Sequence, residues 1–572
     1  MLLVAGALLV VRAEPASAST FTVTTAADEH LTSSTGTTCV SPSGCSLRAA
    51  VEAADNLGGT NTINVPPAVY LLTLGELQIG TFPGAQANYN TTIHGTGTAA
   101  NTTIQVPNAG CPPTCSRVFN VDPNLHGGVS VTIDGVTVTG GRSGPGGVGG
   151  AGILAGSTGD STTLTNCVVS NNQVLGTATN APGGGIQQIG GDLVVNGCRF
   201  SANSSGTSDG GAIWYQQLGA DAGSLTVTGS TFDGNVSNAT ANQGGGAIGL
   251  AGTNATYNVS GSTFTANQAT AAAATGGGGA ILKQSGTLTV MSNTFVNNSA
   301  GGAGQGGAIH SLSGNTAIRF NRFVGNTTAA VPGQTLYRST ANAGTVGADD
   351  NWWATNAGPG PNGATNVAVN SWLVLTISAF PTSTPRGGTS VLTASLTINN
   401  LGADTAAAGH VPDGTPVTFA ATLGTVSPAS TTTVNGVSSS TFTAGSSPGN
   451  GSGSTTVDGQ TVSTPVTVLP PPVPTLVTHA SGPVPVGGTI SDTATLAAGN
   501  APAGSITFTL FGPNNASCTG TPVFTSSPVT VTGNGNYPSG AFTTTAAGTY
   551  RWIAVYSGDP NNADVAPTAC ND

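Results

Sequence analysis

Charged side chains are scarce in this chain of 572 residues. Asp, Glu, Lys and Arg together make up 6% of the sequence, whereas ordinary globular domains contain about 25%. Lysine occurs once, at Lys283, and the net charge of −11 reflects 22 acids opposed by 11 bases. Because the sequence has no basic patch and no basic residues interleaved with aromatics, it argues against nucleic acid as a partner. We expect a surface built from Thr, Ser, Asn and Gly.

Long apolar runs are missing beyond the N-terminus. Residues 2–11 form an apolar run that is too short to cross a bilayer, and Ala16-Ser17-Ala18 after it is a small-x-small cleavage site. We therefore expect a signal peptide at residues 1–18, with Ser19 as the first residue after export. No other segment is apolar enough to span a membrane, which predicts a secreted or cell-surface protein.

The cysteines are few but fall into local pairs, which fits an oxidising compartment. Zinc binding is the alternative, although Cys-x3-Cys without a nearby His is a weak metal signal. Two of the cysteines occupy the same position in adjacent copies of a repeat, where they would stack. We expect disulfides in all pairs, namely Cys39 with Cys45, Cys111 with Cys115, Cys167 with Cys198, and Cys518 with Cys570.

One short motif recurs six times between residues 149 and 326: a Gly-Gly-Ala-Ile-like step, a run that alternates apolar and polar residues, and then Phe-x-x-Asn. The copies are spaced by 28 to 32 residues, and internal repeats of this length indicate stacked units. Their aromatic position is held by Val169, Phe200, Phe232, Phe264, Phe295 and Phe323. Their Asn position is held by Asn172, Asn203, Asn235, Asn267, Asn298 and Asn326.

The pattern within each copy indicates which repeat architecture the chain adopts. Each copy alternates apolar and polar residues with a period of two, as in Leu225 and Val227, and this pattern is typical of a strand with one buried face. No copy has an apolar helical stripe, which excludes helical repeats, and a propeller blade needs about 40 residues. We therefore predict a right-handed parallel β-helix in which Phe stacks on Phe and Asn on Asn, with a structural role for both columns.

A helix is expected only at residues 46–56, where Leu47, Ala50, Val51 and Ala54 share one face and could cover the first coil. The run Cys45-Ser46-Leu47-Arg48-Ala49-Ala50, after a Phe-Thr-Val-Thr-Thr strand at residues 21–25, resembles the Cys-Ser-Leu-Arg-Glu-Ala module of secreted bacterial β-helix proteins. The sequence departs from that module at Ala49. The Gly-Gly-Ala-Ile and Phe-x-x-Asn phrases resemble the repeats of bacterial polymorphic outer-membrane proteins. That resemblance implies a surface-displayed and often adhesive protein.

The array is expected to close near Trp352 and Trp353, where Asp349-Asp350-Asn351-Trp352-Trp353 and a later Gly-Pro-Gly resemble the end of many β-helices. The tryptophans are expected to cover the last coil, and a sugar-stacking platform is the alternative. These resemblances cover about the first 366 residues. We place the β-helix at residues 19–366, with its cap at 19–58.

The repeat disappears after residue 372, and Thr, Val, Ser and Pro dominate. Residues 373–468 resemble a bacterial immunoglobulin-like (Ig-like) domain of the invasin and intimin type. Residues 469–474 form a stiff Pro-rich linker. Residues 475–572 resemble a second such domain, in which Tyr550 is similar to a tyrosine corner. The chain stops two residues after Cys570, so we expect this domain to be truncated in the gene model.

Catalysis requires acids or bases gathered at one place. The acids of the array do not recur at one repeat position, so no acidic column is expected. Asp349-Asp350 resembles the paired Asp of polygalacturonases but lacks their Gly-His-Gly segment. His94 takes a turn position equivalent to that of Asp134, and His310 is expected at the surface. We therefore expect no catalytic residue, cofactor or metal.

Two functions remain open: a monomeric adhesion or extracellular binding protein with Ig-like spacers, and a polysaccharide-active β-helix enzyme with accessory domains. The ligand of the first is expected to be a glycan or a cell-surface component. A solenoid places its insertions on one face, so we expect any binding surface on the loops between Phe-x-x-Asn and Gly-Gly. These loops span residues 204–209, 236–244, 268–277 and 299–305.

Overall fold

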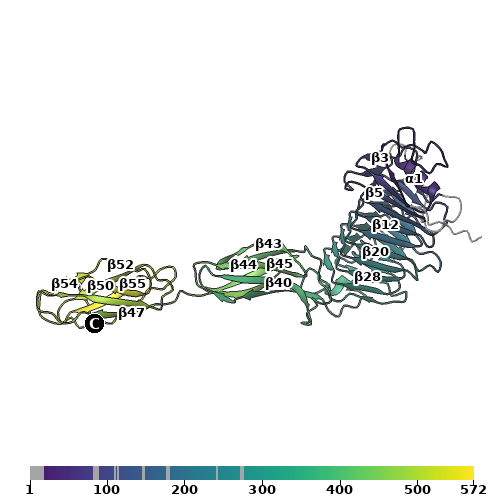
Figure 1. Ribbon diagram of the computed structural model, residues 1–572. Helices are drawn as coiled ribbons and strands as arrows, with labels where there is room; N and C mark the ends of the chain where they lie inside the picture. Colours follow the sequence, from purple (N-terminus) through teal and green to yellow (C-terminus); the bar gives the residue numbers. More distant parts are fainter. Residues whose placement is uncertain are drawn as a thin grey trace, which may run out of the picture.

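The computed structural model of the chain describes residues 18–81, 89–107, 111, 115–144, 149–175, 181–239, 243–270 and 276–571. The protein is nearly all-β: a parallel β-solenoid of about nine turns in the described part of the chain, followed by two antiparallel Ig-like units. The solenoid and the Ig-like units meet in a bend (Figure 1). The fold class expected from the sequence is thus confirmed. The expected signal peptide lies, apart from Ala18, outside the described residues.

Each complete coil of the solenoid contributes one strand to each of four parallel ladders, here called sheets 1 to 4 in the order in which the chain visits them. Sheet 1 contains β1 (Ser19–Thr22), β2 (Thr60–Val65), β5 (Tyr89–Gly95), β8 (Val129–Asp134), β12 (Ser161–Thr165), β16 (Asp192–Asn196), β20 (Ser224–Thr228), β24 (Thr256–Ser260), β28 (Thr287–Met291), β32 (Thr316–Arg319) and β36 (Val346–Gly347). Sheet 2 contains β3 (Val69–Leu71), β6 (Thr103–Gln105), β9 (Thr137–Thr139), β13 (Val168–Ser170), β17 (Arg199–Ser201), β21 (Thr231–Asp233), β25 (Thr263–Thr265), β29 (Thr294–Val296) and β33 (Arg322–Val324).

Sheets 3 and 4 complete the coil. Sheet 3 consists of two-residue strands, β10 (Arg142–Ser143), β14 (Gln173–Val174), β18 (Ser204–Ser205), β22 (Val236–Ser237), β26 (Gln268–Ala269), β30 (Ser299–Ala300) and β34 (Thr327–Thr328). Sheet 4 contains β4 (Leu77–Ile79), β7 (Phe119–Val121), β11 (Ile153–Ala155), β15 (Ile186–Ile189), β19 (Ile213–Gln216), β23 (Ile248–Ala251), β27 (Ile281–Lys283), β31 (Ile309–Ser311), β35 (Leu336–Arg338) and β37 (Ala364–Thr365).

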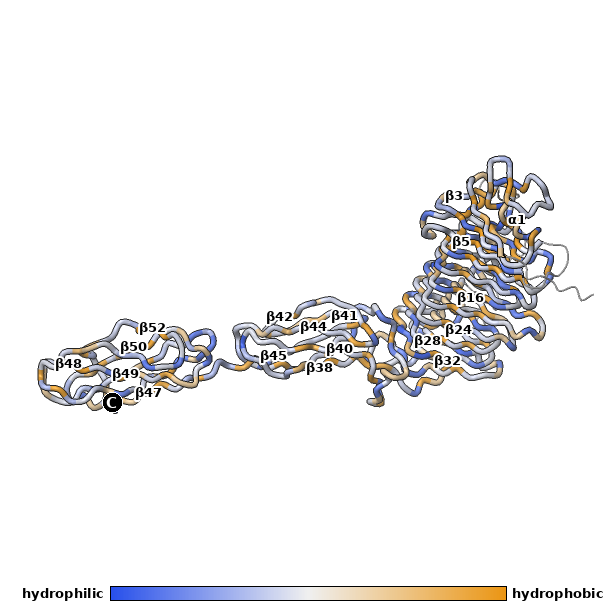
Figure 2. Tube along the Cα trace, viewed as in Figure 1, coloured by the Kyte–Doolittle hydropathy of each residue, from blue (hydrophilic) through white to orange (hydrophobic). Residues whose placement is uncertain are grey.

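The solenoid interior is filled by columns of like residues. Hydrophobic residues recur from coil to coil along the stack (Figure 2). Sheet 2 supplies an aromatic column in which Phe232 and Phe264 lie parallel with ring centroids 4.7 Å apart, and Phe264 and Phe295 are 4.8 Å apart. Sheet 4 supplies an isoleucine column through Ile213, Ile248 and Ile281. These side chains are fully buried, and the column spacing follows the distance between neighbouring strands, about 4.8 Å.

A ladder of asparagines runs beside the aromatic column; we call it the Asn ladder. At Asn235, the side-chain Nδ2 donates to Asn267 Oδ1 at 2.9 Å and to the backbone oxygen of Phe200 at 3.0 Å. Its Oδ1 accepts the backbone N–H of Asn203 at 3.1 Å. Each buried amide thereby satisfies backbone groups at the turn that follows sheet 2. The same pattern joins Asn172, Asn203, Asn235, Asn267, Asn298 and Asn326.

A second polar ladder, which we had not expected, lies at the turn between sheets 1 and 2. Each side chain accepts the backbone N–H of its counterpart one coil earlier, as Ser230 Oγ does from Cys198 N at 3.1 Å and Asn321 Oδ1 from Asn293 N at 2.8 Å. We call this the mixed ladder. Its members are Cys198, Ser230, Ser262, Asn293, Asn321 and Asn351.

The mixed ladder corrects the pairing expected for Cys167 and Cys198, because both are buried free thiols. Cys198 Sγ accepts the backbone N–H of Cys167 at 3.3 Å, as the serines and asparagines of the other coils do. Cys167 Sγ lies 3.2 Å from the backbone oxygen of Ile133. The two sulfurs thus serve as hydrogen-bonding groups at the turn. The structure holds the other expected disulfides: Cys39–Cys45, Cys111–Cys115 and Cys518–Cys570.

The Gly-Gly step of each copy has a steric cause. Gly245 has a φ of +70°, in the left-handed region that favours glycine. A Cβ on Gly246 would clash with the backbone oxygen of Gly279 in the next coil. The first glycine therefore turns the chain, and the second lets adjacent coils approach.

The helix α1 (Leu47–Leu57) covers the first coils, as the sequence predicted. Ser46 is its N-cap, since Ser46 Oγ accepts the backbone N–H of Ala49 at 3.0 Å, which contributes about 1 kcal/mol. Leu47, Ala50 and Val51 join the continuous solenoid core. The exposed apolar end of the array is thereby buried.

The other end of the array is closed by the two tryptophans in different ways. Trp353 stacks on Phe323 at 5.0 Å and so ends the aromatic column. Trp352 is fully buried and packs with Phe320 in the core of the first Ig-like unit. Because both rings are buried, neither can serve as the sugar-stacking platform considered from the sequence. The short helix α2 (Gly360–Gly363) follows.

The first Ig-like unit packs two sheets around its own core and is fused to the last coil through Phe320 and Trp352. One sheet contains β38 (Leu373–Phe380), β40 (Thr389–Asn399), β44 (Val437–Ala444) and β42 (Gly424–Ser427). The other contains β39 (Ser383–Thr384), β46 (Gln460–Val468), β45 (Gly449–Val457), β41 (Pro416–Ala421) and β43 (Ser430–Thr432).

The second Ig-like unit has a separate core that includes Phe508, Trp552 and Tyr556. Tyr550 Oη donates to the backbone oxygen of Ala546 at 3.2 Å, as in a tyrosine corner. The strands of this unit are β47 (Thr475–Ala480), β48 (Thr489–Ile490), β49 (Asp492–Ala497), β50 (Ser505–Phe511), β51 (Phe524–Thr525), β52 (Val529–Thr530), β53 (Gly535–Pro538), β54 (Phe542–Thr543) and β55 (Arg551–Tyr556). Among the described residues, neither helix has the length and apolar character needed to cross a bilayer.

Candidate ligand-binding cavity

The paired acids of the closing coil have structural partners. Asp350 Oδ1 accepts the hydroxyl of Ser371 at 2.7 Å and the amide of Asn399 at 3.0 Å, which ties the last coil to the first Ig-like unit. Asp349 Oδ1 accepts the backbone N–H of Asn370 at 2.7 Å. The described residues include no group of three or more His, Cys, Asp or Glu side chains that could hold a metal ion.

The histidines and the single lysine also lie in structural settings. His94 and Asp134 occupy equivalent positions, as expected, but they lie in strands β5 and β8 and not in turns. His94 Nδ1 lies 2.7 Å from Asp134 Oδ2. The surface position expected for His310 is wrong. Its ring is fully buried, packs edge-on against Tyr337, and lies with Nδ1 3.2 Å from the backbone oxygen of Gly276. Burial lowers the pKa of His310 to about 4.

Lys283 is buried and points into the solenoid. Its register partner in the preceding coil is Leu250. Its Nζ donates to the backbone oxygens of Asn315 at 2.9 Å and Gly286 at 3.1 Å. Burial lowers its pKa to about 7. The ammonium group therefore satisfies turn carbonyls in the interior.

The loops that we expected to form a binding edge are packed against the solenoid where the structure describes them. Ser205, Ser208 and Asp209 are buried, and so are Ser237 and Ala269. Residues 240–242 and 271–275 of these loops lie outside the described residues. The described loop segments thus offer few side chains to a ligand.

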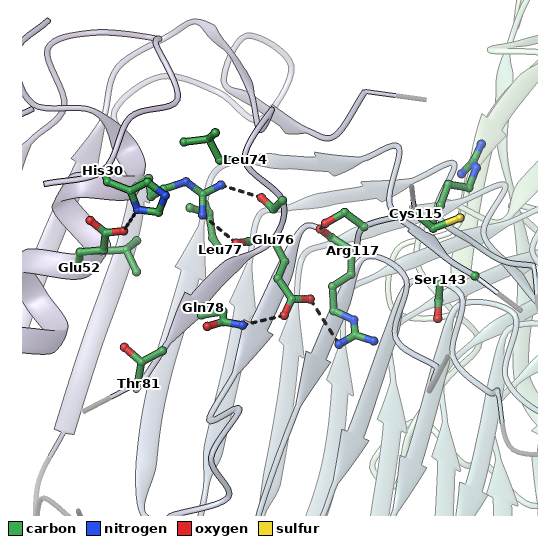
Figure 3. Close-up of a pocket in the computed structure, with 16 residues that line it drawn as sticks. His30, Glu52, Leu74, Glu76, Leu77, Gln78, Thr81, Cys115, Arg117 and Ser143 are labelled. Carbon is green, nitrogen blue, oxygen red and sulfur yellow. Dashed lines mark hydrogen bonds and ion pairs between the residues drawn. The ribbon is translucent and has the colours of Figure 1, made fainter. Parts of the chain in front are cut away.

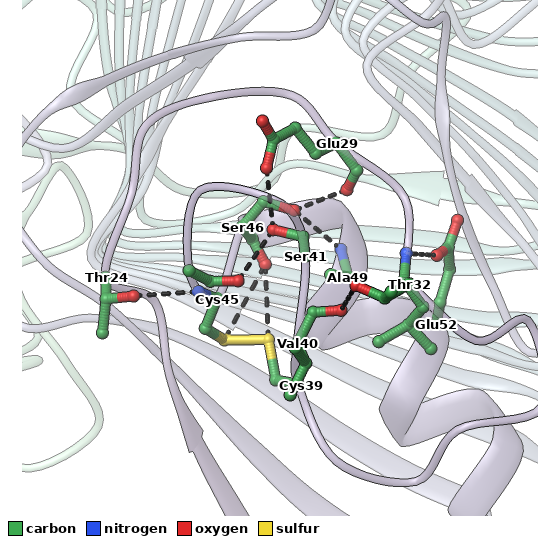
Figure 4. Close-up of a disulfide and its surroundings, with 12 residues drawn as sticks. Thr24, Glu29, Thr32, Cys39, Val40, Ser41, Cys45, Ser46, Ala49 and Glu52 are labelled. Atoms are coloured by element: carbon green, nitrogen blue, oxygen red, sulfur yellow. Dashed lines mark hydrogen bonds between the residues drawn. A yellow bond between two sulfur atoms is a disulfide. The ribbon is translucent and has the colours of Figure 1, made fainter.

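The capped end of the solenoid offers a different arrangement. The Cys39–Cys45 disulfide closes the loop that leads into α1, with Cα atoms 5.1 Å apart (Figure 4). Ser46 Oγ donates to the backbone oxygen of Glu29 at 2.6 Å while it caps the helix (Figure 4). The disulfide and this bond hold the loop against the start of the helix.

Buried charges then fix α1 to the first coils. Arg48 pairs with Asp28 through Nε at 2.7 Å and also donates to the backbone oxygens of Gly75 and Glu76. Asp55, at the other end of the helix, accepts the backbone N–H of Gly80 and of Thr81, both at 2.9 Å. Burial raises the pKa of Asp55 in spite of these hydrogen bonds. These contacts set the distance between the helix and the edge of sheet 4.

A cavity of about 610 Å³ lies between α1 and the first coils (Figure 3). Five segments form its walls: the loop at His30, the helix, the edge of β4, the residues before β7, and β10. This volume lies within the range of small-molecule sites, about 300–1,000 Å³. Its polar lining residues are His30, Arg48, Glu52, Glu76, Gln78, Thr81, Ser116, Arg117, Arg142 and Ser143.

Glu76 and Arg117 form the centre of one wall. Arg117 Nη1 lies 3.4 Å from Glu76 Oε2, and Glu76 Oε1 accepts the amides of Gln78 at 3.1 Å and Asn120 at 2.8 Å (Figure 3). The Nε of Arg117 is buried and has no hydrogen-bond partner within the described part of the chain. Burial lowers the pKa of Arg117, because only part of its charge is compensated.

Arg142 borders the same cavity from β10. Its backbone N–H donates to the backbone oxygen of Ser116 at 2.8 Å, which holds it next to the segment that contains Arg117. Its Nη1 donates to the backbone oxygens of Asn171 at 2.7 Å and Gly141 at 3.1 Å. Burial lowers the pKa of this guanidinium too. The cavity thus combines cationic donors with carboxylate acceptors and suits binding of a polar ligand.

Comparisons with known proteins give little further information. No protein-family model matches the sequence, and no curated protein matches it. Similar solved structures include the adhesin InvE of Yersinia pseudotuberculosis, with 22% identity over 33% of this chain and 57% of that chain, and a TM-score of 0.19. They also include FdeC, an Escherichia coli adhesin (21% identity, 36% and 67% covered, TM-score 0.17), and the D0–D1 domain of intimin (18% identity, 34% and 96% covered, TM-score 0.15).

The chain spans about 57% of the length of the InvE structure. TM-scores at this level support no argument about function. The interpretation of the site therefore depends on its own residues.

Sequence reasoning missed this cavity, because its residues come from five separate segments between His30 and Gly144. One signal was present: four of the chain's ten arginines fall in its N-terminal quarter, and three of these, Arg48, Arg117 and Arg142, line the cavity. Nothing local in the sequence indicated that they face one space.

Proposed function

We propose that this protein is an extracellular or cell-surface binding protein of the adhesin type. The β-helix at residues 19–366 is the binding unit, and the Ig-like units at 373–468 and 475–572 are spacers joined by the linker at 469–474. In this proposal the signal peptide directs export, and the chain is related to the secreted bacterial β-helix proteins that its motifs resemble.

The position of the cavity supports this proposal most directly. Residues of α1 line the cavity, and α1 lies at the end of the solenoid that is far from the Ig-like units (Figure 1). The solenoid is joined to the first Ig-like unit through a shared core and buried polar contacts at the end opposite α1. This arrangement holds the cavity away from whatever surface the Ig-like units stand on.

The composition and the disulfides also support an extracellular setting. A surface of Thr, Ser, Asn and Gly with 6% charged residues offers few groups for non-specific electrostatic binding. Disulfides such as Cys518–Cys570 persist in oxidising compartments. The titratable groups of the closing coil are used by structural contacts, so an enzyme function receives no support from Asp349 and Asp350.

A glycan-array and whole-cell binding screen with the purified full chain tests the proposal. We expect saturable binding to at least one glycan or cell surface, with the protein eluting as a monomer. In parallel, pectins and other acidic glycans are incubated with the protein. Release of reducing ends or unsaturated products, lost in Asp349→Asn/Asp350→Asn, would replace the binding function with a polysaccharide-degrading one.

A further inference from the structure

The cavity at the α1 end gathers cationic side chains in a chain that has few. Of its 11 basic residues, Arg48, Arg117 and Arg142 line this one space. The chain as a whole carries a net charge of −11, so this concentration of arginines is a local departure from its average. An arginine side chain is always charged and offers five N–H donors in a planar fork.

The three arginines differ in how many of their donors are occupied. Arg48 uses four of its five N–H groups, because both carboxylate oxygens of Asp28 and the backbone oxygens of Gly75 and Glu76 accept them. Arg117 has one weak ion pair, at 3.4 Å, and a buried Nε without a partner among the described residues. Arg142 uses only Nη1 in its bonds to backbone oxygens.

A buried guanidinium with an unused donor is destabilised unless an acceptor is supplied. A carboxylate is the acceptor that fits best, because it receives two parallel N–H groups from one guanidinium. Nε of Arg117 is too deeply buried to reach a ligand. Nη2 of Arg117 and the Nε and Nη2 of Arg142 have no partner among the described residues, and these donors suit a ligand with a carboxylate.

The remaining lining residues limit what else the ligand can carry. Glu52 and Glu76 add negative charge to the walls, which disfavours a ligand with many anionic groups. Gln78, Ser116 and the two glutamates offer acceptors and donors suited to hydroxyl groups. A ligand with one carboxylate per unit and several hydroxyls meets both requirements.

We infer that the cavity binds an acidic sugar, with its carboxylate on Arg117 and Arg142 and its hydroxyls on the polar walls. This inference rests on the proposed function, because it names the ligand class of the same site. Glu76 competes with the ligand for Arg117, since its Oε2 already lies beside Nη1 of that residue. The acidic sugar must therefore displace or share this contact.

Isothermal titration calorimetry with the full chain tests the inference. The probes are a galacturonic acid trisaccharide, its methyl-esterified form, sialyl-lactose, a heparin-derived disaccharide and tri-glutamate. We expect one of the two acidic sugars to bind, and the choice between them identifies the source of the carboxylate. For either ligand, the methyl ester of the same sugar is the uncharged control and should bind at least about tenfold more weakly, because the charged hydrogen bonds are lost.

Two variants that should weaken binding and one that should strengthen it make the test specific. Arg117→Gln and Arg142→Gln should each weaken binding about tenfold, and Glu76→Gln should strengthen it by removing the competing carboxylate. Arg199→Gln is the matched control, because Arg199 lies on the solenoid surface in an exposed pair with Asp233. Circular dichroism and thermal unfolding identify a variant that fails to fold, in which case the Glu76→Gln result decides.

Several outcomes would overturn the inference. Equal binding of the ester and the acid, tighter binding of tri-glutamate or the heparin disaccharide, or unchanged binding in all three cavity variants would each do so. If neither acidic sugar binds but the whole-cell screen detects adhesion, the inference fails and the proposed function stands. If neither sugar nor cell binds, both fail.

Discussion

Arg322 in the last full coil and Asp458 in the first Ig-like unit form an ion pair across the junction of the two units. Arg322 Nε donates to Asp458 Oδ2 at 2.8 Å, and its Nη2 donates to the other carboxylate oxygen. Trp352 Nε1 donates to the same Oδ2 at 2.8 Å. Both charged side chains are largely buried, with 14% and 7% of their surfaces exposed. The carboxylate thus joins the closing coil to the first Ig-like unit by accepting three N–H groups.

Asp458→Asn should loosen this junction. The substitution leaves the Arg322 guanidinium buried without its counter-charge, which destabilises by about 3 kcal/mol. We expect a lower urea midpoint and a broader distribution of shapes in small-angle X-ray scattering. Asp233→Asn, in an exposed pair with Arg199, is the control and should cost less than about 1 kcal/mol. Equal effects of the two substitutions would contradict the role assigned to Asp458.

The Asn ladder should be a major source of solenoid stability. Asn235→Ala removes the acceptor of Asn203 N and the donor to the backbone oxygen of Phe200, and both groups are buried. We expect a loss of about 3 kcal/mol, because buried polar groups without partners are costly. Asn258→Ala, on the exposed face of β24, should change stability little. Chemical denaturation measures the stability of both variants. If Asn235→Ala leaves the stability unchanged, the Asn ladder is not a major source of it.

The thiols of Cys167 and Cys198 should react with a thiol reagent only after the chain unfolds. Both are almost fully buried and hydrogen-bonded at the turn between sheets 1 and 2. We expect a thiol reagent to find no reactive sulfur in the native chain and two in denaturant, because the other described cysteines are bridged. Absence of thiols in denaturant would show that the pair is oxidised in the isolated protein, as the sequence alone suggested.

Asp209 should make stability depend on pH. Burial raises its pKa to about 7, although it accepts the backbone N–H of Gly244 at 2.7 Å. In the unfolded chain the group releases its proton near pH 4, so between about pH 4 and 7 the folded state holds a proton that the unfolded state has lost. The free energy of unfolding therefore falls as pH rises through this window and is level above it.

Asp209→Asn should reduce this slope, because the amide carries no charge at any pH. We expect the variant to gain at most about 4 kcal/mol relative to the natural chain between pH 4 and 8, from three pKa units at 1.36 kcal/mol each. Asp160, whose pKa is also raised to about 7 by burial, contributes equally to both proteins. Urea unfolding across this pH range measures the difference, and Asp564→Asn is an exposed control. If the free energies of unfolding of the natural chain and of Asp209→Asn change with pH in parallel, Asp209 is not a source of the pH dependence.

The solenoid was predictable because its determinants are local and repeated. A period of two in each strand and the recurring Phe-x-x-Asn phrase specify strands, turns and stacking without reference to distant residues. The start of α1 was predictable for the same reason, since Ser46 is a helix N-cap followed by apolar residues on one face. In the C-terminal part, tight turns between apolar runs indicated strands, and the Ig-like assignment came from the resemblance to bacterial Ig-like domains.

The candidate site was not predictable in this way. Arg117 and Arg142 face one cavity only because coils stack and α1 lies across their end. Similarly, the mixed ladder is occupied by Cys, Ser and Asn, which share an acceptor atom rather than a residue type. Cys, Ser and Asn all accept hydrogen bonds, so a search for acceptor side chains at this repeat position would find the ladder and include Cys198 in it.

By itself, then, the sequence determined the repeating core: which residues alternate inward, where each coil turns, and which end the helix covers. The tertiary structure alone decided which distant groups meet, as in Arg322 with Asp458, 136 residues apart, and in the burial of His310 beside Gly276 and Tyr337. The physical reason is the range of the interactions. Periodicity and capping act within a few residues of the chain, whereas cavities and buried ion pairs depend on how completed coils and units pack.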